Sequence, residues 1–540
     1  MQRKTSTHPA PMASLAMGLA ASIALSAAPA RAQGQTPFAQ GERWGHVSGP
    51  ANPWLPDATT FAAGDELVVV ASRGGAGGLA VYGAHDGASG VARGFDARYA
   101  LAQGATAVAA GERADAVYAL AQYPAPDAYT RRVELARHDP VAAARGGSFA
   151  PVWLRELDIR INGPSRLACD EAGDVVVAAA YDDRTGNVRV DRVDGVSGAL
   201  LVRRDLPAPG LSRLALSGDG RRVAISAGLE LWILDELGQT VHTRSLDSAA
   251  QALAFSFDGA TLAIGGTGKL QVVRESVGGS YALLSNFNVA SNELAAATSV
   301  SRDGGDVAIA WWNFSTGVDA RMELWHLATM ARTADFAQVG TPISRQNLPV
   351  VASITADGRR AAFGLWGDGG TPEVVLLEAG RALPLMAFDL PGSVRALDFD
   401  ETGTRVVVAH KNVHNSQWGA SGAVRLLDTG ERSLELLDTP EAGGALQAVA
   451  RHQGAGMAFF ALGQPLAAGQ SFPGVQGELL LQRGTMTVFP AALDASGRAN
   501  LTLPLANHPA LIGSRVHIQA AFRVPGALAL SPERLDALIL

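Results

Sequence analysis

The sequence has little cysteine, little charge and no long apolar run beyond its start. Its one cysteine, Cys169, cannot form an internal disulfide. Charged residues make up 18% of the 540 residues and the formal net charge is −7, whereas nucleic-acid binding needs a basic surface. No apolar run after residue 32 reaches the roughly 20 residues of a membrane-spanning helix. These absences argue against a disulfide scaffold, a nucleic-acid-binding protein and a spanning helix in the mature chain.

The first 32 residues have the pattern of a secretory signal. Arg3 and Lys4 form a basic start, residues 15–25 are apolar, and a small-x-small sequence ends at Ala32. Such a segment directs export and is then removed, and its apolar core is too short to span a bilayer. We expect cleavage before Gln33 and an exported protein of bacterial origin, periplasmic or extracellular. An uncleaved membrane anchor is the alternative.

Residues 212–238 show the unit from which most of the chain is built. Three short runs alternate between apolar and polar residues, which indicates half-buried strands. An Asp-Gly pair at 219–220 separates the first two runs, and this pair is a strong hairpin signal. The unit is therefore a three-strand meander, to which residues 240–246 can add a fourth strand.

The second strand of this unit recurs eight times, and two positions just before it keep their chemistry in six copies. The first position is apolar: Cys169, Leu216, Phe255, Val300, Ile354 and Phe399. The next position carries a short oxygen-bearing side chain: Asp170, Ser217, Ser256, Ser301, Thr355 and Asp400. We expect the apolar column to pack between repeats. We expect the oxygen-bearing column to bond backbone N–H groups of the Gly-containing turn that follows.

Four antiparallel strands repeated about every 40 to 50 residues is the period of a β-propeller blade. The repeats resemble the WD-repeat-like propellers of exported bacterial proteins, although the Trp-Asp dipeptide is absent and residues 231–235 are its nearest match. The resemblance covers roughly residues 55–437 and implies a fold rather than an activity. We predict an all-β chain with an eight-bladed or seven-bladed propeller over 55–437, with residues 33–54 as a possible closing strand.

The repeat stops after residue 437, and Pro and Gly at 438–444 indicate a linker. Residues 445–540 then contain strand-like runs separated by Pro and Gly, at 457–462, 478–482, 486–489, 500–505, 516–522 and 535–540. We expect a small antiparallel β-sandwich-like domain. Residues 511–522 resemble the end of accessory domains in other exported bacterial proteins.

Two residues of the innermost strands, Cys169 and Asp398, lead to separate predictions. Cys169 falls in the apolar column, so we expect a buried, unreactive thiol rather than a reactive one. Asp398 alternates with apolar neighbours and can face the central channel. One carboxylate without a recognisable partner does not define an acid–base site.

Blade topology places the short Gly-containing turns on one face of the ring, the short-turn face. The second-to-third loops and the interblade connections, which are longer and more aromatic, lie on the other, the loop face. The candidate ligand-binding residues there are Tyr181, Trp311, Trp312, Asn313, Trp366, Asp368, His410 and Trp418. Aromatic rings beside amides and carboxylates suit sugars or peptides, and the alternative is that the rings pack within their own loops.

The sequence shows no catalytic constellation. His410 and His414 are four apart, but only a helix would place both on one face, so we expect no metal. No serine-hydrolase or phosphate-loop motif occurs in the context it requires. We therefore predict an exported, non-catalytic binding or scaffold protein without cofactors, which binds a protein or carbohydrate ligand of the cell envelope on one propeller face. The alternative is a propeller hydrolase or lactonase with a site in the channel.

Overall fold

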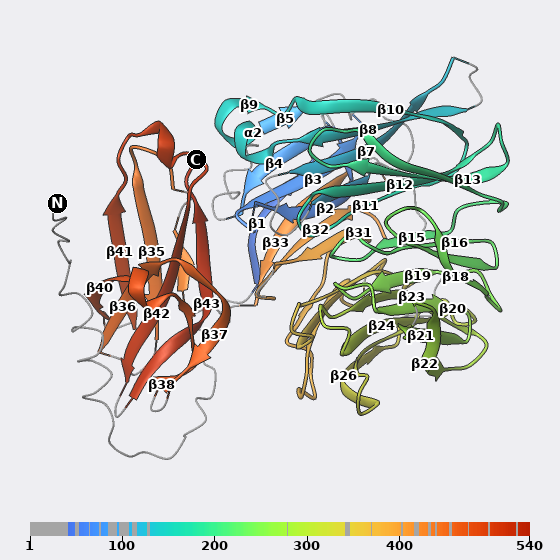
Figure 1. Ribbon diagram of the computed structural model, residues 1–540. Helices are drawn as coiled ribbons and strands as arrows, with labels where there is room; N and C mark the ends of the chain where they lie inside the picture. The colour runs from blue at the N-terminus through green and yellow to red at the C-terminus, as the bar shows by residue number, and fades with distance from the viewer. Residues whose placement is uncertain are drawn as a thin grey trace, which may run out of the picture. The chain divides into compact units, whose positions relative to one another are not determined.

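The computed structural model divides into a unit that spans Gly41–Thr429 and a second unit from Gly430 to Leu540 (Figure 1). Residues 1–40, with the expected signal peptide and cleavage site, lie outside the described residues. The structure describes residues 41–48, 53–63, 65–74, 77–84, 94–96, 107–110, 116–126, 130–277, 279–340, 346–368, 370–400, 403–414, 419, 421–429, 434–437, 440–452, 456–472, 475–494, 497–524 and 527–540.

The first unit is a closed ring of eight sheets, seven with four strands and one with five. Each innermost strand contacts the next one along the chain, and the last contacts the first, so the ring closes (Figure 1). We number the sheets as blades 1–8 by their innermost strands. These are β2 (Leu55–Ala62), β6 (Ala107–Ala110), β11 (Ser165–Cys169), β15 (Arg213–Leu216), β19 (Ala252–Phe255), β23 (Glu293–Val300), β27 (Pro349–Ile354) and β31 (Val394–Phe399). The predicted propeller is confirmed, with eight blades.

Blades 3 to 6 are regular four-stranded meanders. In each, the register shifts between the third and fourth strands, and such a β-bulge bends the outer edge and hinders pairing with another chain. Their outer strands are β12 (Val175–Asp182), β13 (Asn187–Asp194) and β14 (Leu200–Leu206); β16 (Val223–Ala227), β17 (Glu230–Leu234) and β18 (Thr240–Ser245); β20 (Thr261–Gly266), β21 (Lys269–Glu275) and β22 (Tyr281–Asn288); and β24 (Asp306–Asn313), β25 (Asp319–His326) and β26 (Ala331–Gln338).

Blades 1, 2 and 7 are less regular. Blade 1 continues with β3 (Leu67–Arg73), β4 (Leu79–Gly83), β5 (Gly94–Asp96) and β9 (Gly147–Ser148); blade 2 with β7 (Val117–Pro124), β8 (Arg131–His138) and β10 (Pro151–Ile161); and blade 7 with β28 (Arg360–Leu365), β29 (Val374–Glu378) and β30 (Met386–Phe388). The strand β9 pairs in parallel with β5, so a detour of the chain after β8 completes blade 1.

The detour includes a short helix that the repeat did not predict, α2 (Pro140–Gly146). Its start follows from local sequence, because Asp139 Oδ1 accepts the N–H of Ala142 at 2.8 Å and Pro140 occupies the first turn. No helix in the part of the chain that the structure describes is long and apolar enough to span a membrane.

Blade 8 joins the two ends of the ring. Its inner strands are β31, β32 (Arg405–Lys411) and β33 (Gly422–Asp428), and its outermost strand is β1 (Gly41–Val47), which pairs antiparallel with β33. A strand from the segment 33–54 therefore completes the last blade. This pairing ties the start of the ring to its end.

The apolar core lies between neighbouring blades. The second strands β16, β20 and β32 are buried along their whole length, because each packs on both sides against the adjacent sheets. Separate buried clusters fill the interfaces between successive blades, for example Tyr118 of blade 2 with Val176 of blade 3. A blade cannot bury both faces alone, which is why the repeat forms a ring.

The C-terminal unit is a two-sheet β-sandwich. One sheet contains β34 (Leu434–Leu436), β35 (Ala445–Arg451) and β41 (Arg498–Pro504); the other contains β38 (Val475–Gln476), β43 (Ala527–Leu538), β42 (Arg515–Val524), β36 (Met457–Gly463) and β40 (Thr487–Ala492), and a hairpin pairs β37 (Pro465–Ser471) with β39 (Glu478–Leu481). Apolar residues of both sheets form one core, with Leu446 and Leu501 from the first and Phe460 and Phe522 from the second.

The units divide at residue 430, earlier than the boundary after residue 437 expected from the sequence. The difference arises at β34, which follows β33 in the chain as the fourth strand of blade 8 would. However, β1 pairs with β33 at the outer edge of blade 8, and β34 pairs with β35 of the sandwich.

Candidate binding site at the channel mouth

The ends of the innermost strands are fixed by the oxygen-bearing repeat position. In blade 4, Ser217 Oγ accepts the N–H of Arg222 at 2.9 Å and donates to Asp219 Oδ1 at 2.7 Å. The intervening Gly220 has a φ of 72°, which a Cβ would disfavour. Equivalent bonds occur at Ser256, Ser301 and Thr355, and directly from backbone N–H groups to Asp170 and Asp400. The predicted role of this column is confirmed, and it makes each turn a rigid part of the channel mouth.

Backbone hydrogen bonds connect these turns to one another along blades 3 to 7. Each N–H donates to a carbonyl in the next turn: Glu171 to Gly218 at 2.9 Å, Asp219 to Phe257 at 2.8 Å, Phe257 to Arg302 at 3.0 Å, and Arg302 to Ala356 at 3.2 Å. The short-turn face is therefore a hydrogen-bonded chain of turns rather than a set of independent hairpins.

An ion pair crosses the channel on this face. Arg302 of blade 6 donates from Nη1 to both carboxylate oxygens of Glu171 of blade 3, at 2.6 and 2.5 Å, although two blades separate them around the ring. The guanidinium also lies over the ring of Phe257, 4.0 Å from its centroid. We call Glu171, Phe257 and Arg302 the channel cap. The cap extends across the channel mouth from blade 3 to blade 6, past blades 4 and 5.

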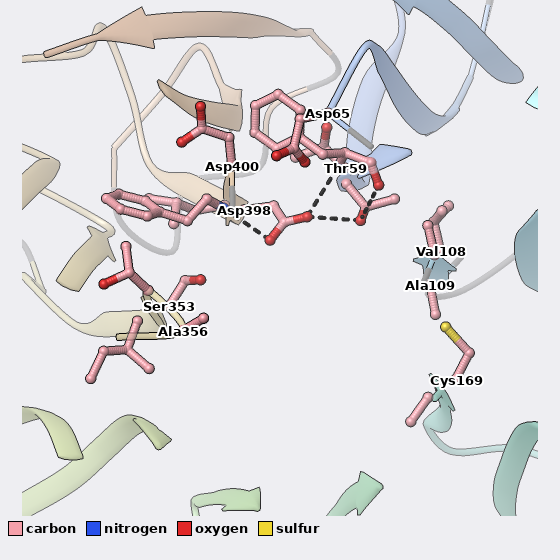
Figure 2. A pocket seen from close by; sticks show the side chains of 17 residues that line it. Thr59, Asp65, Val108, Ala109, Cys169, Ser353, Ala356, Asp398 and Asp400 are labelled. Atoms are coloured by element: carbon pink, nitrogen blue, oxygen red, sulfur yellow. Dashed lines mark hydrogen bonds between the residues drawn. The ribbon is translucent and has the colours of Figure 1, made fainter. Parts of the chain in front are cut away.

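The other side of the mouth holds a cavity of about 370 Å³. Figure 2 shows side chains from the innermost strands and following turns of blades 1, 2, 3, 7 and 8 around it. The labelled residues include Thr59, Ala109, Cys169, Ser353 and Asp398. In blades 3, 7 and 8 the lining comes from strand ends that the turn hydrogen bonds fix, so this part of the cavity has a preformed shape.

Asp398 of β31 lies at this cavity, as its position on the strand predicted. Its Oδ2 accepts from Thr60 Oγ1 at 2.8 Å and from the N–H of Phe61 at 3.0 Å, and its Oδ1 accepts the N–H of Phe399 at 2.9 Å (Figure 2). Burial raises the pKa of Asp398, and these hydrogen bonds partly offset that effect. A carboxylate has roughly four acceptor positions, so three bonds leave room for one donor from the cavity.

The charges around the cavity are mainly negative. Its lining includes the carboxylates of Asp65, Asp398 and Asp400. Two guanidinium groups lie nearby: Arg405 donates to Asp400 Oδ2 at 3.1 Å and to the backbone oxygen of Asp65 at 3.2 Å, and Arg360 donates to the Gly403 carbonyl at 3.0 Å. No three His, Cys, Asp or Glu side chains are grouped to hold a metal ion in the described part of the chain.

Cys169 differs from the expectation in its position. It is half-buried, packs at the edge of the cluster between blades 2 and 3, and also lines the cavity. The expectation of full burial is wrong because the last residue of an innermost strand borders the channel mouth as well as the neighbouring blade. Burial, with Asp170 and Asp398 nearby, raises the pKa of the Cys169 thiol. A raised pKa disfavours the thiolate, so an unreactive thiol stays our prediction.

Three of the predicted loop-face residues are buried: Asp368 in its loop, and Trp311 and His410 on strands. Trp311 is 1% exposed, lies in the core between blades 5 and 6, and donates from Nε1 to Glu323 Oε2 at 2.8 Å. His410 has no exposed surface and accepts from Arg425 Nε at Nε2, at 2.9 Å. Their expected exposure is wrong, because strands β24 and β32 stay buried between blades up to these positions.

Asp368 and the remaining predicted residues mostly stabilise their own loops. Asn313 Oδ1 accepts the N–H of Ser315 at 3.0 Å, Asp368 Oδ1 accepts that of Gly370 at 2.9 Å, and Trp312 Nε1 donates to the Gly317 carbonyl at 3.0 Å. Tyr181 is half-buried against the blade 3–4 core, and Trp366 is half-buried with the Lys411 ammonium 5.6 Å above its ring. Trp418 lies outside the described residues.

Sequence reasoning missed Thr60 and Phe61, which hold Asp398, and the channel cap. Thr60 and Phe61 belong to the first blade, where the repeat pattern is weakest. The cap residues occupy one repeat column, directly after the oxygen-bearing position, where the side chain changes from Glu171 to Phe257 and Arg302. The column also holds Gly218 and Ala356, so the available signal was the charged or aromatic side chain at its other three positions in blades 3 to 7.

No protein-family model and no curated protein matches this chain. Among solved structures, it is similar to the Sqt1 protein of Chaetomium thermophilum, whose crystal structure is described as bound to the N-terminus of the ribosomal protein L10. The sequence identity is 13% and the TM-score is 0.48, over 72% of this chain and 100% of that chain. The propeller assignment itself rests on the eight sheets and the closed ring.

Proposed function

We propose that this chain is an exported, non-catalytic binding scaffold whose propeller holds a basic side chain of a protein partner at the channel mouth. The observation that carries the proposal is Asp398, a carboxylate that three donors hold in place beside a preformed cavity. A lysine or arginine of the partner would supply the additional donor and the compensating charge.

The size of the cavity supports a small occupant. Pockets for drug-sized ligands span about 300–1,000 Å³, and the 370 Å³ here is near the lower end, which fits one long side chain. A neutral side chain would leave Asp398 without compensation for its burial, whereas a cation would lower its pKa and favour the ionised form.

The rigidity of the mouth supports binding without rearrangement. The turns of blades 3 to 7 are hydrogen-bonded to one another, and Asp398 joins blade 8 to blade 1 through Thr60 and Phe61. A preformed site loses little conformational entropy when a ligand enters, so a shallow contact can still give useful affinity.

Export rests on the N-terminal sequence. Arg3, Lys4, the apolar residues 15–25 and the small residues before Gln33 together support a cleaved signal. N-terminal sequencing of exported protein should give Gln33 as the first residue, and a chain that begins at Met1 would contradict cleavage.

Binding can be tested on the full chain with labelled peptides Gly-Gly-X-Gly-Gly, in which X is Lys, Arg, acetyl-lysine or norleucine. Fluorescence polarisation should show saturable binding of the Lys or Arg peptide, at least about tenfold tighter than acetyl-lysine or norleucine, because only the cation compensates Asp398. Equal binding of all four peptides would refute the proposal.

Variants separate the channel mouth from the loop face. Asp398→Asn should lower the affinity for the cationic peptide about tenfold, and Ala109→Lys, which places a cation in the cavity without altering the Asp398 hydrogen bonds, should block it. Trp366→Ala is the loop-face control and should bind like the parent. Loss of binding in Trp366→Ala alone would favour the loop face instead. Hydrolysis of ester or lactone substrates that Asp398→Asn abolishes would replace the scaffold with the channel hydrolase.

A further inference from the structure

Two arginine side chains lie at the loop-face end of the channel, opposite the channel mouth. Arg166 is the second residue of β11 and Arg213 is the first residue of β15, and these innermost strands of blades 3 and 4 contact each other. Both arginines occupy the same repeat position, three residues before the apolar column, and both are half-buried. Adjacent blades therefore place two guanidinium groups at the same end of the channel.

Backbone carbonyl oxygens fix both guanidinium groups at the starts of these strands. Arg166 donates from Nη1 to the Ser165 carbonyl at 3.3 Å and from Nη2 to the Ser212 carbonyl at 3.5 Å. Arg213 donates from Nη1 to the same Ser212 carbonyl at 2.9 Å and from Nε to the Gln251 carbonyl of blade 5. Because both side chains reach one carbonyl oxygen, one small ligand can contact both guanidinium groups.

Each guanidinium group keeps hydrogen-bond donors for a ligand. An arginine side chain has five N–H donors, and Arg166 and Arg213 each use two of them on carbonyl oxygens. Within the part of the chain that the structure describes, neither side chain has a further hydrogen bond or ion pair. The other N–H donors are therefore available, and charged donors of this kind form strong hydrogen bonds to phosphate and carboxylate oxygens.

The positive charge of this pair has no carboxylate partner among the described residues. Elsewhere in the ring, the buried guanidinium of Arg405 lies 3.1 Å from Asp400 Oδ2. The charged neighbour of Arg213 is instead another cation: burial lowers the pKa of Arg213 to about 10, and the charge of Arg166 adds to this effect. Burial also lowers the pKa of Arg166. Two like charges that are partly removed from water cost stability, and a bound anion would offset this cost.

We propose that Arg166 and Arg213 bind a small dianionic oxyanion, free phosphate or the phosphate group of a small molecule, at the loop-face end of the channel. A dianion matches the two positive charges, whereas a monoanion leaves one of them uncompensated. The site goes beyond the proposed binding of a cationic side chain, because it lies at the other end of the innermost strands and takes a ligand of opposite charge.

The test is isothermal titration of the full chain at about pH 8, where phosphate is mainly a dianion. The probes are inorganic phosphate, glycerol phosphate and acetate in a low-salt Tris buffer. At least one phosphate probe should show saturable binding that is about tenfold tighter than that of acetate, because only a dianion pairs with both guanidinium groups. The tighter of the two phosphate probes identifies the free ion or the ester as the ligand. If neither phosphate probe binds more tightly than acetate, the proposal is wrong.

Glutamine variants remove one charge each and keep an amide donor for the carbonyl oxygens. Arg166→Gln and Arg213→Gln should each weaken phosphate binding at least about tenfold. Arg192→Gln is the matched control, because Arg192 of blade 3 is also half-buried and donates to a carbonyl of blade 4, that of Gly220 at 2.7 Å, but from the short-turn end of its strand. It should bind phosphate like the parent, and so should Asp398→Asn, which separates this result from that at the channel mouth.

A melting series keeps the test valid if the variants are less stable. Phosphate should raise the melting temperature of the parent and of Arg192→Gln, and should leave that of Arg166→Gln and Arg213→Gln unchanged, because only proteins that bind the ion gain stability from it. If Arg166→Gln and Arg213→Gln melt at a lower temperature but bind phosphate as the parent does, the two arginines only connect the blades, and the proposal is wrong.

Discussion

On the short-turn face, oxygen-bearing side chains at one repeat position close six turns, and backbone hydrogen bonds connect the turns of blades 3 to 7. On the loop face, each loop is stabilised differently: Asn313 bonds its own loop, Trp366 packs with Lys411, and His410 is buried beside Arg425. The first face repeats one local solution in six of the eight blades, whereas the second depends on which side chains the fold brings together.

This difference explains why the prediction about the turns was right. Ser217 and its equivalents interact within five residues, so the sequence alone shows their role. Trp311 bonds Glu323 on the next strand and packs against blade 5, which its loop-like surroundings in the sequence do not reveal. Aromatic residues near loops are therefore poor indicators of a binding face when the adjoining strands are buried on both sides.

The largest expected effect concerns Trp311. Trp311→Ala should lower the free energy of unfolding by about 3–5 kcal/mol, because it empties a buried site and leaves the Glu323 carboxylate with one donor fewer. Tryptophan fluorescence in a urea titration measures this effect selectively, since all nine Trp residues precede residue 430. Trp366→Ala, at a half-buried ring, should cost much less. A Trp311→Ala protein as stable as the parent would place this ring on the exposed face after all.

The second prediction is a pH dependence from the loop-face end of blade 8. Burial lowers the pKa of His410 to about 4, from an ordinary value of 6.5. Between these values the unfolded chain binds a proton that the folded chain does not, so this group costs stability as the pH falls from 6.5 to 4, by about 3 kcal/mol in total. Urea titrations at pH 7 and 4.5 measure the loss.

The control for this prediction is His410→Gln, which can keep a hydrogen bond but cannot titrate. It should lose less stability than the parent between pH 7 and 4.5. On the short-turn face, the raised pKa of Asp398 has the opposite effect on stability. As the pH rises above 3.8, the unfolded chain loses this proton before the folded chain does, so this group lowers stability as the pH rises. Equal pH profiles for the parent and His410→Gln would mean that His410 is not buried as a neutral ring.

The smallest expected effect concerns the channel cap. The Arg302 side chain is 33% exposed and that of Glu171 10%, so their pair is only partly screened from solvent. A double-mutant cycle with Glu171→Gln and Arg302→Leu should give a coupling energy of about 1 kcal/mol, which falls in high salt. A coupling energy of zero would show that the two side chains do not pair across the channel, and that this face is held by its backbone hydrogen bonds alone.

The sequence predicted the propeller because each blade is a local structure. Alternating strands, turns such as that at Gly220 and a constant oxygen-bearing position recur along the chain, and a blade with two apolar faces must pack against copies of itself. Such information was weakest in the first two blades. The helix α2 and the parallel strand β9 interrupt the repeat there, and the repeat pattern did not predict them.

Only the tertiary structure determined the contacts between residues far apart in the chain. Asp398 meets Thr60 and Phe61 because the ring closes, and Glu171 meets Arg302 because their turns lie across the same channel. A strand pattern shows which side of a sheet a residue occupies but not which distant residue lies opposite. By itself the sequence determined the repeating blade and the chemistry of its turns; the closed ring determined which side chains share the channel mouth.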